Sequence, residues 1–282
     1  EEVLLQVGLV VKKKSKGCYD RFRERIMIPI IDEKGHTVGF GARILNSGQP
    51  KYLNSPETPL FNKRRLLFGL NEAGKFIRQQ EYAIIVEGYM DAIALASNGV
   101  SNVVASLGTA FTAEQCKKLM RYSPNIYFCY DSDAAGQTAT IRALSIARNS
   151  GANVKVILLP DGKDPDEFIR KHGSTAFSKL IDKALNFIDF HLYHIMHTID
   201  YASLDGKVKA VSFILPVLAS VNNLVESNGY TIRIAQALGI DETDLRAEVQ
   251  KYRRKKSCHE APVVKLNPSV DTSGDNAVVK AG

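Results

Sequence analysis

Unbroken apolar blocks recur through the middle of the chain and predict buried parallel strands. Residues 83–86 and 126–130 are such blocks, and together with further expected strands at 102–106 and 154–159 they alternate with segments of helical pattern. Strands covered by helices on both faces have this continuous apolar character, and strands that alternate with helices form parallel sheets. We therefore expect an α/β domain over residues 81–173, in which helices cover both faces of a parallel sheet.

Short local signals mark where the helices of this domain begin and end. Thr112 and Gln115 have the spacing of a capping box, in which each side chain binds the other's backbone N–H. Gly99 and Gly151 follow two expected helices, where a C′ glycine ends the helix, and a third helix is expected to stop at Gly173. Gly136 is expected to allow close packing of its helix on the sheet.

The first 80 residues have short apolar segments and many turn residues, which predict a mostly β region. A hairpin is expected to turn at 33–35, with Gly39 and Gly41 allowing close backbone approach. Three prolines within 50–59 predict a fixed loop rather than a regular element. Arginines alternate with other residues over 21–25, which predicts an extended segment with Arg21, Arg23 and Arg25 on one face.

The last part of the chain is predicted to be helical. Helices are expected at 177–199, 204–225 with an interruption at Pro216, 230–238 and 241–256. Together they predict a helical subdomain over residues 174–256, arranged as a bundle or hairpin. Residues 257–282 have few apolar side chains and are expected to be a disordered linker.

The composition is that of a soluble globular protein, with 45% hydrophobic and 24% charged residues among 282. No apolar block approaches the roughly 20 residues of a membrane-spanning helix. The first residue is Glu, and no targeting signal is visible, so we expect a piece of a longer protein. The four cysteines have no C-x-x-C spacing, which favours neither zinc nor disulfides and fits the reducing cytoplasm.

The net charge of +7 is concentrated at one end of the chain. Residues 1–80 have 15 Lys and Arg against 8 Asp and Glu, whereas residues 81–282 have 22 of each. A basic region joined to an acidic one suits an enzyme that acts on polyphosphates or nucleic acid. A solvated lysine-rich surface is the alternative interpretation.

Acidic residues follow three of the predicted strands. Glu87 follows the block at 83–86, Asp131 and Asp133 follow the block at 126–130, and a third acidic pair, Asp164 and Asp166, lies beyond 154–159. The carboxyl ends of parallel strands meet at one edge of the sheet, so these carboxylates are expected to face one crevice. Their mutual repulsion requires a cation, and hard oxygen ligands favour Mg²⁺ or Mn²⁺. The pattern therefore predicts a metal site.

Structural roles compete with each of these interpretations. Asp131 and Asp133 could cap the helix that begins near Ala134, and Asp91 could lie in its helix's first turn because the helix dipole favours a carboxylate there. His191, His194 and His197 are three apart on a helix, but packing or surface roles are favoured over metal binding. The basic run 253–256 is typical of a solvated helix end.

Several of these segments resemble one protein family. Glu87-Gly88-Tyr89-Met90-Asp91, Asp131-Ser132-Asp133 with Gly136, and Asp164-Pro165-Asp166 resemble the three acidic motifs of the Toprim domain. The segments 21–25 and 50–58 resemble the region that precedes this domain in bacterial DnaG-type replicative DNA primases. The resemblance covers about residues 8–175, and the basic segments distinguish it from Toprim nucleases and topoisomerases. Ser132 stands where the family commonly has glycine, a small change that should leave both aspartates in place.

The resemblance implies an RNA-polymerase core that makes short RNA primers on single-stranded DNA by two-metal nucleotidyl transfer. The residues that it implies as catalytic metal ligands are Glu87, Asp131 and Asp133. The supporting acids are Asp91, Asp164 and Asp166. The basic ridge for nucleic acid and nucleotides comprises Arg21, Arg23, Arg43, Lys51, Asn54 and Lys63.

The resemblance also implies partners and missing parts. We expect two or more Mg²⁺ or Mn²⁺ ions, template DNA, RNA primer and ribonucleoside triphosphates, and a cytoplasmic monomer. The zinc-binding domain, the first part of the polymerase domain and the helicase-binding domain of the family are expected to be absent from this chain, so a replicative helicase would bind elsewhere in the complete protein. A metal-dependent Toprim nuclease and a non-catalytic nucleic-acid-binding fragment are the alternative functions.

Overall fold

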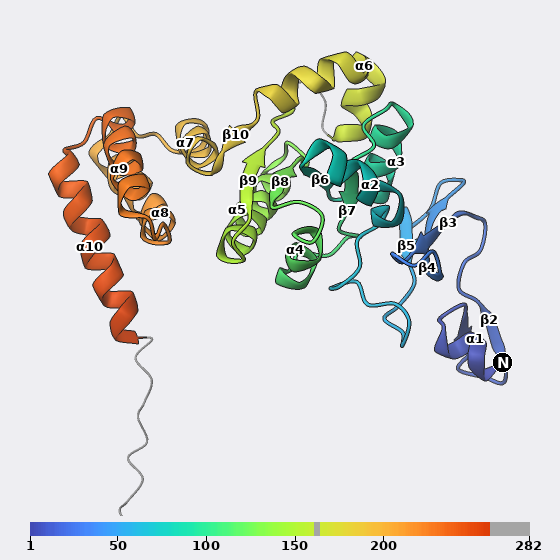
Figure 1. Cartoon of the computed structure of the whole chain (residues 1–282). Coiled ribbons are helices and arrows are strands. Elements are labelled where there is room, and N and C mark those ends of the chain that lie inside the picture. Colours follow the sequence, from blue (N-terminus) through green and yellow to red (C-terminus); the bar gives the residue numbers. More distant parts are fainter. Residues whose placement is uncertain (161–163, 260–282) are drawn as a thin grey trace, which may run out of the picture. The chain divides into compact units, whose positions relative to one another are not determined.

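The computed structural model describes residues 1–160 and 164–259 (Figure 1). The chain divides into two compact units, Glu1–Ala210 and Val211–Gly282. The first contains the basic region and the α/β domain, and the second contains the last helices. In the described residues, no helix has both the length and the apolar character needed to cross a membrane.

The N-terminal region contains two small antiparallel sheets, with a helix at each end of the region. Its elements are α1 (Glu2–Gln6), β1 (Val10–Lys12), β2 (Cys18–Asp20), β3 (Arg25–Ile31), β4 (Thr37–Ile44), β5 (Tyr52–Asn54) and α2 (Leu70–Gln80). Strand β1 pairs with β2, and β3, β4 and β5 form the second sheet. The hairpin expected at 33–35 is confirmed, since β3 and β4 pair on either side of it.

Two elements of this region differ from the sequence prediction. The proline-rich loop contains strand β5, because Tyr52–Asn54 pairs with Gly41–Arg43 at the edge of β4, with prolines only outside the pairing. Helix α2 occupies the end of a region that was expected to be mostly β.

The prediction of an extended segment over residues 21–25 is also wrong. Only Arg25 belongs to a strand, β3, and Glu24 has a φ of 52°, in the left-handed region. A left-handed residue changes the direction of the chain and ends the two-residue alternation of side chains. The three arginines nevertheless line one pocket, which is described below.

The central sheet has five strands in the order β10-β9-β8-β6-β7. Its strands are β6 (Ala83–Val86), β7 (Val103–Ala105), β8 (Asn125–Phe128), β9 (Asn153–Val156) and β10 (Leu185–Asn186). The first four pair in parallel, as predicted, and β10 pairs with β9 in the antiparallel direction. Since β6 connects to β7 on one side and has β8 on the other, the strand order reverses between β6 and β8.

Helices cover both faces of this sheet, as the sequence predicts. They are α3 (Tyr89–Ser97), α4 (Ala113–Leu119), α5 (Ala134–Asn149) and α6 (Pro165–Asp182). On one face, Ile84 and Val86 of β6 pack with residues of α3 and α6, including Leu95 and Phe168. Side chains alternate along a strand, so the neighbouring residue Ile85 is directed to the opposite face. There, α4 and α5 pack together.

The predicted helix signals are largely confirmed. Thr112 and Gln115 form the capping box of α4, and Gly99 and Gly151 follow the ends of α3 and α5 with positive φ. Gly136 packs so closely that a Cβ atom would lie 2.2 Å from the Asp131 carbonyl oxygen. Gly173 has φ 77° and kinks α6, but helical structure resumes after it.

The helices after α6 differ in their limits from the prediction. They are α7 (Phe187–Thr198), α8 (Leu204–Ala219), α9 (Leu224–Leu238) and α10 (Glu242–His259). The short strand β10 precedes α7 within the expected helix 177–199. Pro216 lies inside α8, and α9 begins at Leu224, earlier than predicted. The expected linker 257–282 begins within α10, and its remaining residues, 260–282, lie outside the described residues.

The second unit is held together by an arginine that was expected to be solvated. The Arg253 guanidinium donates hydrogen bonds to the carbonyl oxygens of Leu218 and Val221 and to the Ser227 hydroxyl. These groups lie at the end of α8, just beyond it and in α9. The Leu218 carbonyl also accepts from the Val221 backbone N–H, so Arg253 adds a second donor there and connects α10 to the end of α8 and to α9.

Candidate catalytic pocket

Two of the predicted acidic residues lie where the strand order of the central sheet reverses. Glu87 directly follows β6, and Asp131 follows β8 after two further residues. Strands β6 and β8 are neighbours, with Ile85 paired to Phe128, so their carboxyl ends lie side by side. In parallel sheets, the crevice at such a reversal is the usual place for a ligand.

A pocket of about 340 Å³ opens at this edge and collects most of the predicted site. Its acidic lining residues are Glu87, Asp91, Asp131, Asp164 and Asp166. Its basic and amide residues are Arg43, Lys51 and Asn54. The carboxylates come from the ends of β6 and β8, from α3, and from the start of α6. The basic residues come from β4 and β5, so the small N-terminal sheet forms one wall of the pocket.

The carboxylates destabilise one another's charged forms. Burial, followed by the charges of Glu87 and Asp91, raises the pKa of Asp131 to about 7. Burial, followed by the charge of Asp164, raises the pKa of Asp91 to about 6. Burial also raises the pKa of Glu87, against the lowering effect of the Asp131 backbone N–H. A cation in the pocket would relieve this repulsion.

The remaining acids also have structural roles, as the alternative interpretation predicted. Asp133 caps α5 and accepts a 2.7 Å hydrogen bond from Gly136 N–H. Asp164 caps α6 and accepts a 2.7 Å hydrogen bond from Glu167 N–H. Asp133 is exposed and lies outside the pocket lining, although its charge raises the pKa of both Glu87 and Asp131. It therefore acts on the site at least through its charge.

The other acidic contacts connect α3 with α6. The Asp166 backbone N–H lies 3.4 Å from Oδ1 of Asp91, and the Asp166 carboxylate pairs with Arg170. Asp91 lies in the first turn of α3, where the sequence left a dipole role and a ligand role open. In the pocket, Asp91 lies beside four other carboxylates that repel its charge. A favourable helix dipole alone does not account for a carboxylate at such a position.

The predicted basic residues divide between two pockets. Arg21 and Arg23 line a second pocket of about 480 Å³ together with Arg25. Nε of Arg21 is buried there without a hydrogen-bond partner among the described residues. Lys63 lines neither of these two pockets, and its ammonium lies 5.9 Å from the centre of the Phe61 ring. The predicted ridge is thus not one continuous row of side chains in the same pocket.

The carboxylates suit a divalent cation without forming a ready-made centre. Across residues 1–160 and 164–259, no three His, Cys, Asp or Glu side chains converge closely enough to hold a metal ion. However, Oε1 of Glu87 is buried and has no hydrogen-bond partner in the same part of the chain. A buried, unpartnered carboxylate oxygen among other carboxylates is the donor set that Mg²⁺ or Mn²⁺ prefers. The residues present therefore fit a hard cation.

Sequence reasoning missed two aromatic residues of the pocket. Tyr52 and Tyr89 line it, and their rings meet edge to face with centres 5.8 Å apart. The Tyr89 hydroxyl donates a 3.4 Å hydrogen bond to the Ala42 carbonyl, and a Cβ on Gly41 would lie 2.8 Å from the Tyr89 ring. This contact joins α3 to the small sheet. Gly41 was predicted to allow close approach, but its partner was not visible in the sequence.

The histidines of α7 have packing roles, as favoured by the sequence. His191 is 0% exposed, and its Nδ1 lies 2.6 Å from the Phe187 carbonyl oxygen. Burial lowers the pKa of His191 to about 4. His194 contacts the Gln137 side chain of α5.

Three family models match separate parts of the chain. Residues 1–74 match the family of the DNA primase catalytic core, N-terminal domain, and residues 84–169 match the Toprim-like family. Residues 188–243 match the DnaB-helicase binding domain of primase. The last match corrects the expectation that the helicase-binding part of the family is absent from this chain.

Solved structures and curated relatives are similar to most of this chain. A DNA primase domain from Pseudomonas aeruginosa is 37% identical, with a TM-score of 0.76, over 88% of this chain and 79% of that chain. A DnaG primase catalytic domain bound to ssDNA is 38% identical, with a TM-score of 0.74, over 86% and 77%. The DNA primase of Clostridium acetobutylicum is 44% identical over 239 residues, which are 85% of this chain and 40% of that protein.

The fold and the acidic pocket define the middle of the chain as a Toprim domain. With the primase-specific region before it and the helices after it, the chain belongs to the family of DnaG-type DNA primase catalytic cores. It spans between about 40% and 47% of the length of the first curated relatives that it matches.

Proposed function

We propose that this chain is the catalytic core of a DNA primase that synthesises short RNA primers on single-stranded DNA. The observation that supports this most directly is the pocket at the strand-order reversal, where five carboxylates face Arg43 and Lys51. Relatives that cover most of this chain are named DNA primases, and one solved relative is bound to ssDNA. Replication in the cytoplasm, as a monomer, is part of the proposal.

The chain's own residues bind and orient the two reacting nucleotides. Arg43 and Lys51 hold the triphosphate of the incoming ribonucleotide, because both cations line the pocket opposite the carboxylates. The 3′-hydroxyl oxygen of the preceding nucleotide forms a bond to the α-phosphorus. The bond from that phosphorus to the bridging oxygen breaks, pyrophosphate leaves with the electron pair, and the hydroxyl proton passes to solvent.

Glu87, Asp131 and Asp133, supported by Asp91, Asp164 and Asp166, would hold two or more divalent cations, Mg²⁺ or Mn²⁺. When bound, these ions supply charge stabilisation to the attacking oxygen and the leaving pyrophosphate. Without them, the raised pKa values of Asp131 and Asp91 leave part of the acidic set protonated near neutral pH.

The three regions divide the work. Residues 1–80 hold nucleic acid, with Arg21, Arg23 and Lys63 contacting template or primer, and Asn54 orienting nucleotide in the pocket. Residues 81–173 are the Toprim domain, and residues 174–256 are the helical subdomain. The match at 188–243 supports contact of this subdomain with a DnaB-type replicative helicase.

Carboxylate substitutions test the proposed function. Asp131→Ala and Glu87→Ala, made in the complete reading frame that encodes this chain, should each reduce dinucleotide formation by about 10³-fold or more, because charge stabilisation is lost. Binding of single-stranded DNA should persist. Glu114→Ala is the matched control, since Glu114 is an exposed carboxylate on α4 outside the pocket.

The same assay tests the alternative functions. Labelled single-stranded DNA with Mg²⁺ should remain intact, and short RNA should appear only when ribonucleoside triphosphates are added. Strand cutting that depends on Asp131 would indicate a nuclease and contradict the proposal. Calorimetric titration with Mn²⁺ should give heat that disappears in Asp131→Ala, whereas a non-catalytic fragment without a competent site would give none.

A further inference from the structure

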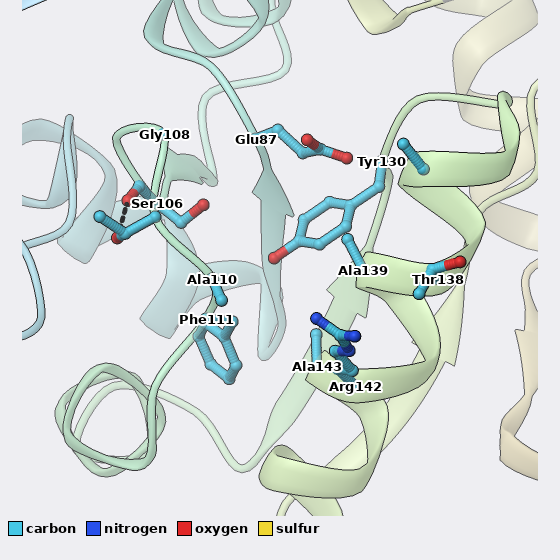
Figure 2. A pocket seen from close by; sticks show the side chains of 12 residues that line it. Glu87, Ser106, Gly108, Ala110, Phe111, Tyr130, Thr138, Ala139, Arg142 and Ala143 are labelled. Carbon is cyan, nitrogen blue, oxygen red and sulfur yellow. Dashed lines mark hydrogen bonds between the residues drawn. The ribbon is translucent and has the colours of Figure 1, made fainter.

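A separate pocket lies on the other side of Glu87, between the loop after β7 and helix α5. Its volume is about 490 Å³. Figure 2 shows the 106–111 loop along one side, α5 along the other, and the Glu87 carboxylate at one end. Among the lining residues of the two pockets, only Glu87 and Gly108 are shared. The basic residues and the other acids of the catalytic pocket are absent from its lining.

The walls of this pocket are firmly packed. Phe111 and Tyr130 are buried, and each meets the Phe128 ring edge to face, with ring centres 5.3 Å and 5.7 Å away. In the loop, the Thr109 hydroxyl donates a 3.0 Å hydrogen bond to the Ser106 carbonyl, drawn in Figure 2. The shape is therefore set by packed rings and by a hydrogen-bonded loop, as in a preformed ligand site.

The chemistry of the lining combines an apolar surface with a single cation. Ala139, Arg142 and Ala143 of α5 lie on one side of the space, and the loop residues Ala110 and Phe111 lie on the other (Figure 2). Arg142 is exposed and has no ion pair or hydrogen bond with the described residues. An apolar slot beside one unpaired guanidinium suits a ligand with a flat ring and a phosphate group.

The position of Glu87 indicates which of the two reacting nucleotides the second pocket binds. A reaction between two nucleotides needs two sites that meet at the reacting atoms, and Glu87 lines both pockets. The catalytic pocket has two cations for the triphosphate that reacts, and the second pocket has one, which suits a phosphate that takes no part in the reaction. The Glu87 carboxylate at the end of the second pocket includes Oε1, which is buried and has no hydrogen-bond partner among the described residues.

We propose that the pocket formed by the 106–111 loop and α5 binds the nucleotide that supplies the attacking 3′-hydroxyl, with its phosphate on Arg142 and its sugar toward Glu87. This inference rests on the proposed primer synthesis and assigns a substrate to each side of Glu87. In the bond-forming step, the 3′-oxygen approaches from this side, and the triphosphate is held by Arg43 and Lys51 on the other. Pyrophosphate therefore leaves on the side of the catalytic pocket.

Dinucleotide synthesis separates the two sides. A template should be used on which the first and second ribonucleotides differ, so that each concentration is varied alone. Arg142→Ala should raise the KM for the first nucleotide about tenfold, the loss expected for a charge-assisted contact, and leave the KM for the second within about twofold. Lys51→Ala should do the reverse. Equal effects of Arg142→Ala on both nucleotides, or none on either, would overturn the assignment.

Two further variants control for folding and for general charge. Ala139→Leu fills the slot without adding charge and keeps a good helix former, so it should also raise the KM for the first nucleotide. Arg121→Ala removes an exposed arginine of the same domain that does not line the pocket, and both KM values should stay unchanged. A change with Arg121→Ala equal to that with Arg142→Ala would show a general charge effect and reject the site.

Binding without catalysis distinguishes failure of this site from failure of the proposed function. In EDTA, GMP and AMP binding is followed by saturation-transfer NMR on the same chain. Arg142→Ala and Ala139→Leu should each weaken it about tenfold, and Arg121→Ala should not. If the wild type makes no primer but these differences persist, the proposed function fails and the nucleotide site stands. If the monophosphates bind all variants equally, or do not bind the wild type, the site is wrong.

Discussion

Gly136 is the point at which α5 approaches the strand-end loop most closely. An alanine in the middle of a helix normally stabilises it relative to glycine, by about 0.5–1 kcal/mol. At Gly136, however, the added Cβ would lie 2.2 Å from the Asp131 carbonyl oxygen and 2.8 Å from its carbon. Backbone would have to move. We expect Gly136→Ala to lower the free energy of unfolding by about 1–3 kcal/mol and to reduce primer synthesis, because Asp131 moves with its backbone.

Gly229 provides the matched comparison for Gly136. It lies in α9, and an added Cβ would meet no heavy atom within 4 Å. Gly229→Ala should therefore raise the free energy of unfolding by about 0.5–1 kcal/mol. Urea unfolding followed by circular dichroism measures both variants. A Gly136→Ala protein as stable as Gly229→Ala would contradict the close contact.

The pKa of Asp131 predicts how stability depends on pH when no cation is bound. Burial and neighbouring carboxylates raise this pKa from 3.8 to about 7, so the folded state favours the protonated form. The stability that protonated Asp131 contributes is fully present below about pH 3.8 and is lost as pH rises to about 7. Asp131→Asn cannot ionise and should become more stable than the wild type over this range, by roughly 1–2 kcal/mol at pH 8 after allowance for solvent screening.

Thermal melting at pH 4.5, 6 and 8 in EDTA tests this dependence. The difference in Tm between Asp131→Asn and the wild type should grow with pH, and Mg²⁺ should abolish or reverse it. Glu114→Gln, at an exposed carboxylate, should show no such trend. A constant difference across the three pH values would mean that Asp131 ionises as freely as a solvated carboxylate.

At the scale of single residues, the sequence predicted the acids better than their surroundings. A carboxylate directly after an apolar strand is fixed at the sheet edge by the strand itself, so Glu87 and Asp131 could be placed. The surroundings of Arg21, Lys63 and Asn54 depend on how distant segments fold together. The 3.3 Å hydrogen bond from Asn54 to the Leu107 carbonyl joins residues 53 positions apart, and no local pattern indicates it.

At the scale of elements, strong periodic patterns were sufficient and short edge elements were not. The four parallel strands and their helices were predicted because each is an apolar block with a defined stop. Strands β5 and β10 have only three and two residues, and they exist because β4 and β9 offer a free edge for pairing. Their own sequences have no strand pattern. The prolines around β5 favoured a loop, and tertiary pairing overrode that preference.

Arg253 illustrates the same limit for the helical unit. The run 253–256 has the pattern of an exposed helix end, yet the guanidinium donates to the Leu218 and Val221 carbonyls and to Ser227. Arg253→Ala should destabilise the second unit by about 2–3 kcal/mol, since it removes charge-assisted hydrogen bonds to partly buried acceptors. Arg253→Lys should restore only part, because all three hydrogen bonds come from the terminal nitrogen Nη2, and the lysine Nζ lies one bond closer to the backbone.

Hydrogen exchange of the amides in α9 and α10 measures this effect locally. Protection should fall in Arg253→Ala while that of the central sheet stays unchanged. Lys251→Ala, which removes an exposed cation of the same helix, should leave protection unchanged. Equal losses in the two variants would show that helix charge, rather than the Arg253 contacts, stabilises the unit.

At the scale of the whole molecule, the charge distribution has two separable consequences. The excess of +7 in residues 1–80 attracts any polyanion, whereas the arginines that line one pocket can hold a phosphate at a defined place. General attraction by the net charge and a direct phosphate contact respond differently to a single substitution. A bulk effect is shared among all cations, and a direct contact is lost with one of them. Salt dependence distinguishes them, because each phosphate contact with single-stranded DNA contributes about 0.7 to the slope of log K against log salt.

Arg23 and Lys75 form the test pair for the basic region. Both are exposed cations within the first 80 residues, and Arg23 lines the arginine pocket whereas Lys75 on α2 does not. Arg23→Ala should weaken binding of single-stranded DNA and reduce the magnitude of the slope by about 0.7. Lys75→Ala should change the affinity and the slope only slightly. The charge that it removes is distant from the arginine pocket, and such a charge has a small effect at 0.15 M salt. Fluorescence anisotropy with a labelled oligonucleotide from 50 to 300 mM salt gives both slopes. Equal slopes in the two variants would show that the N-terminal charge acts as a whole and that the arginine pocket binds no particular phosphate.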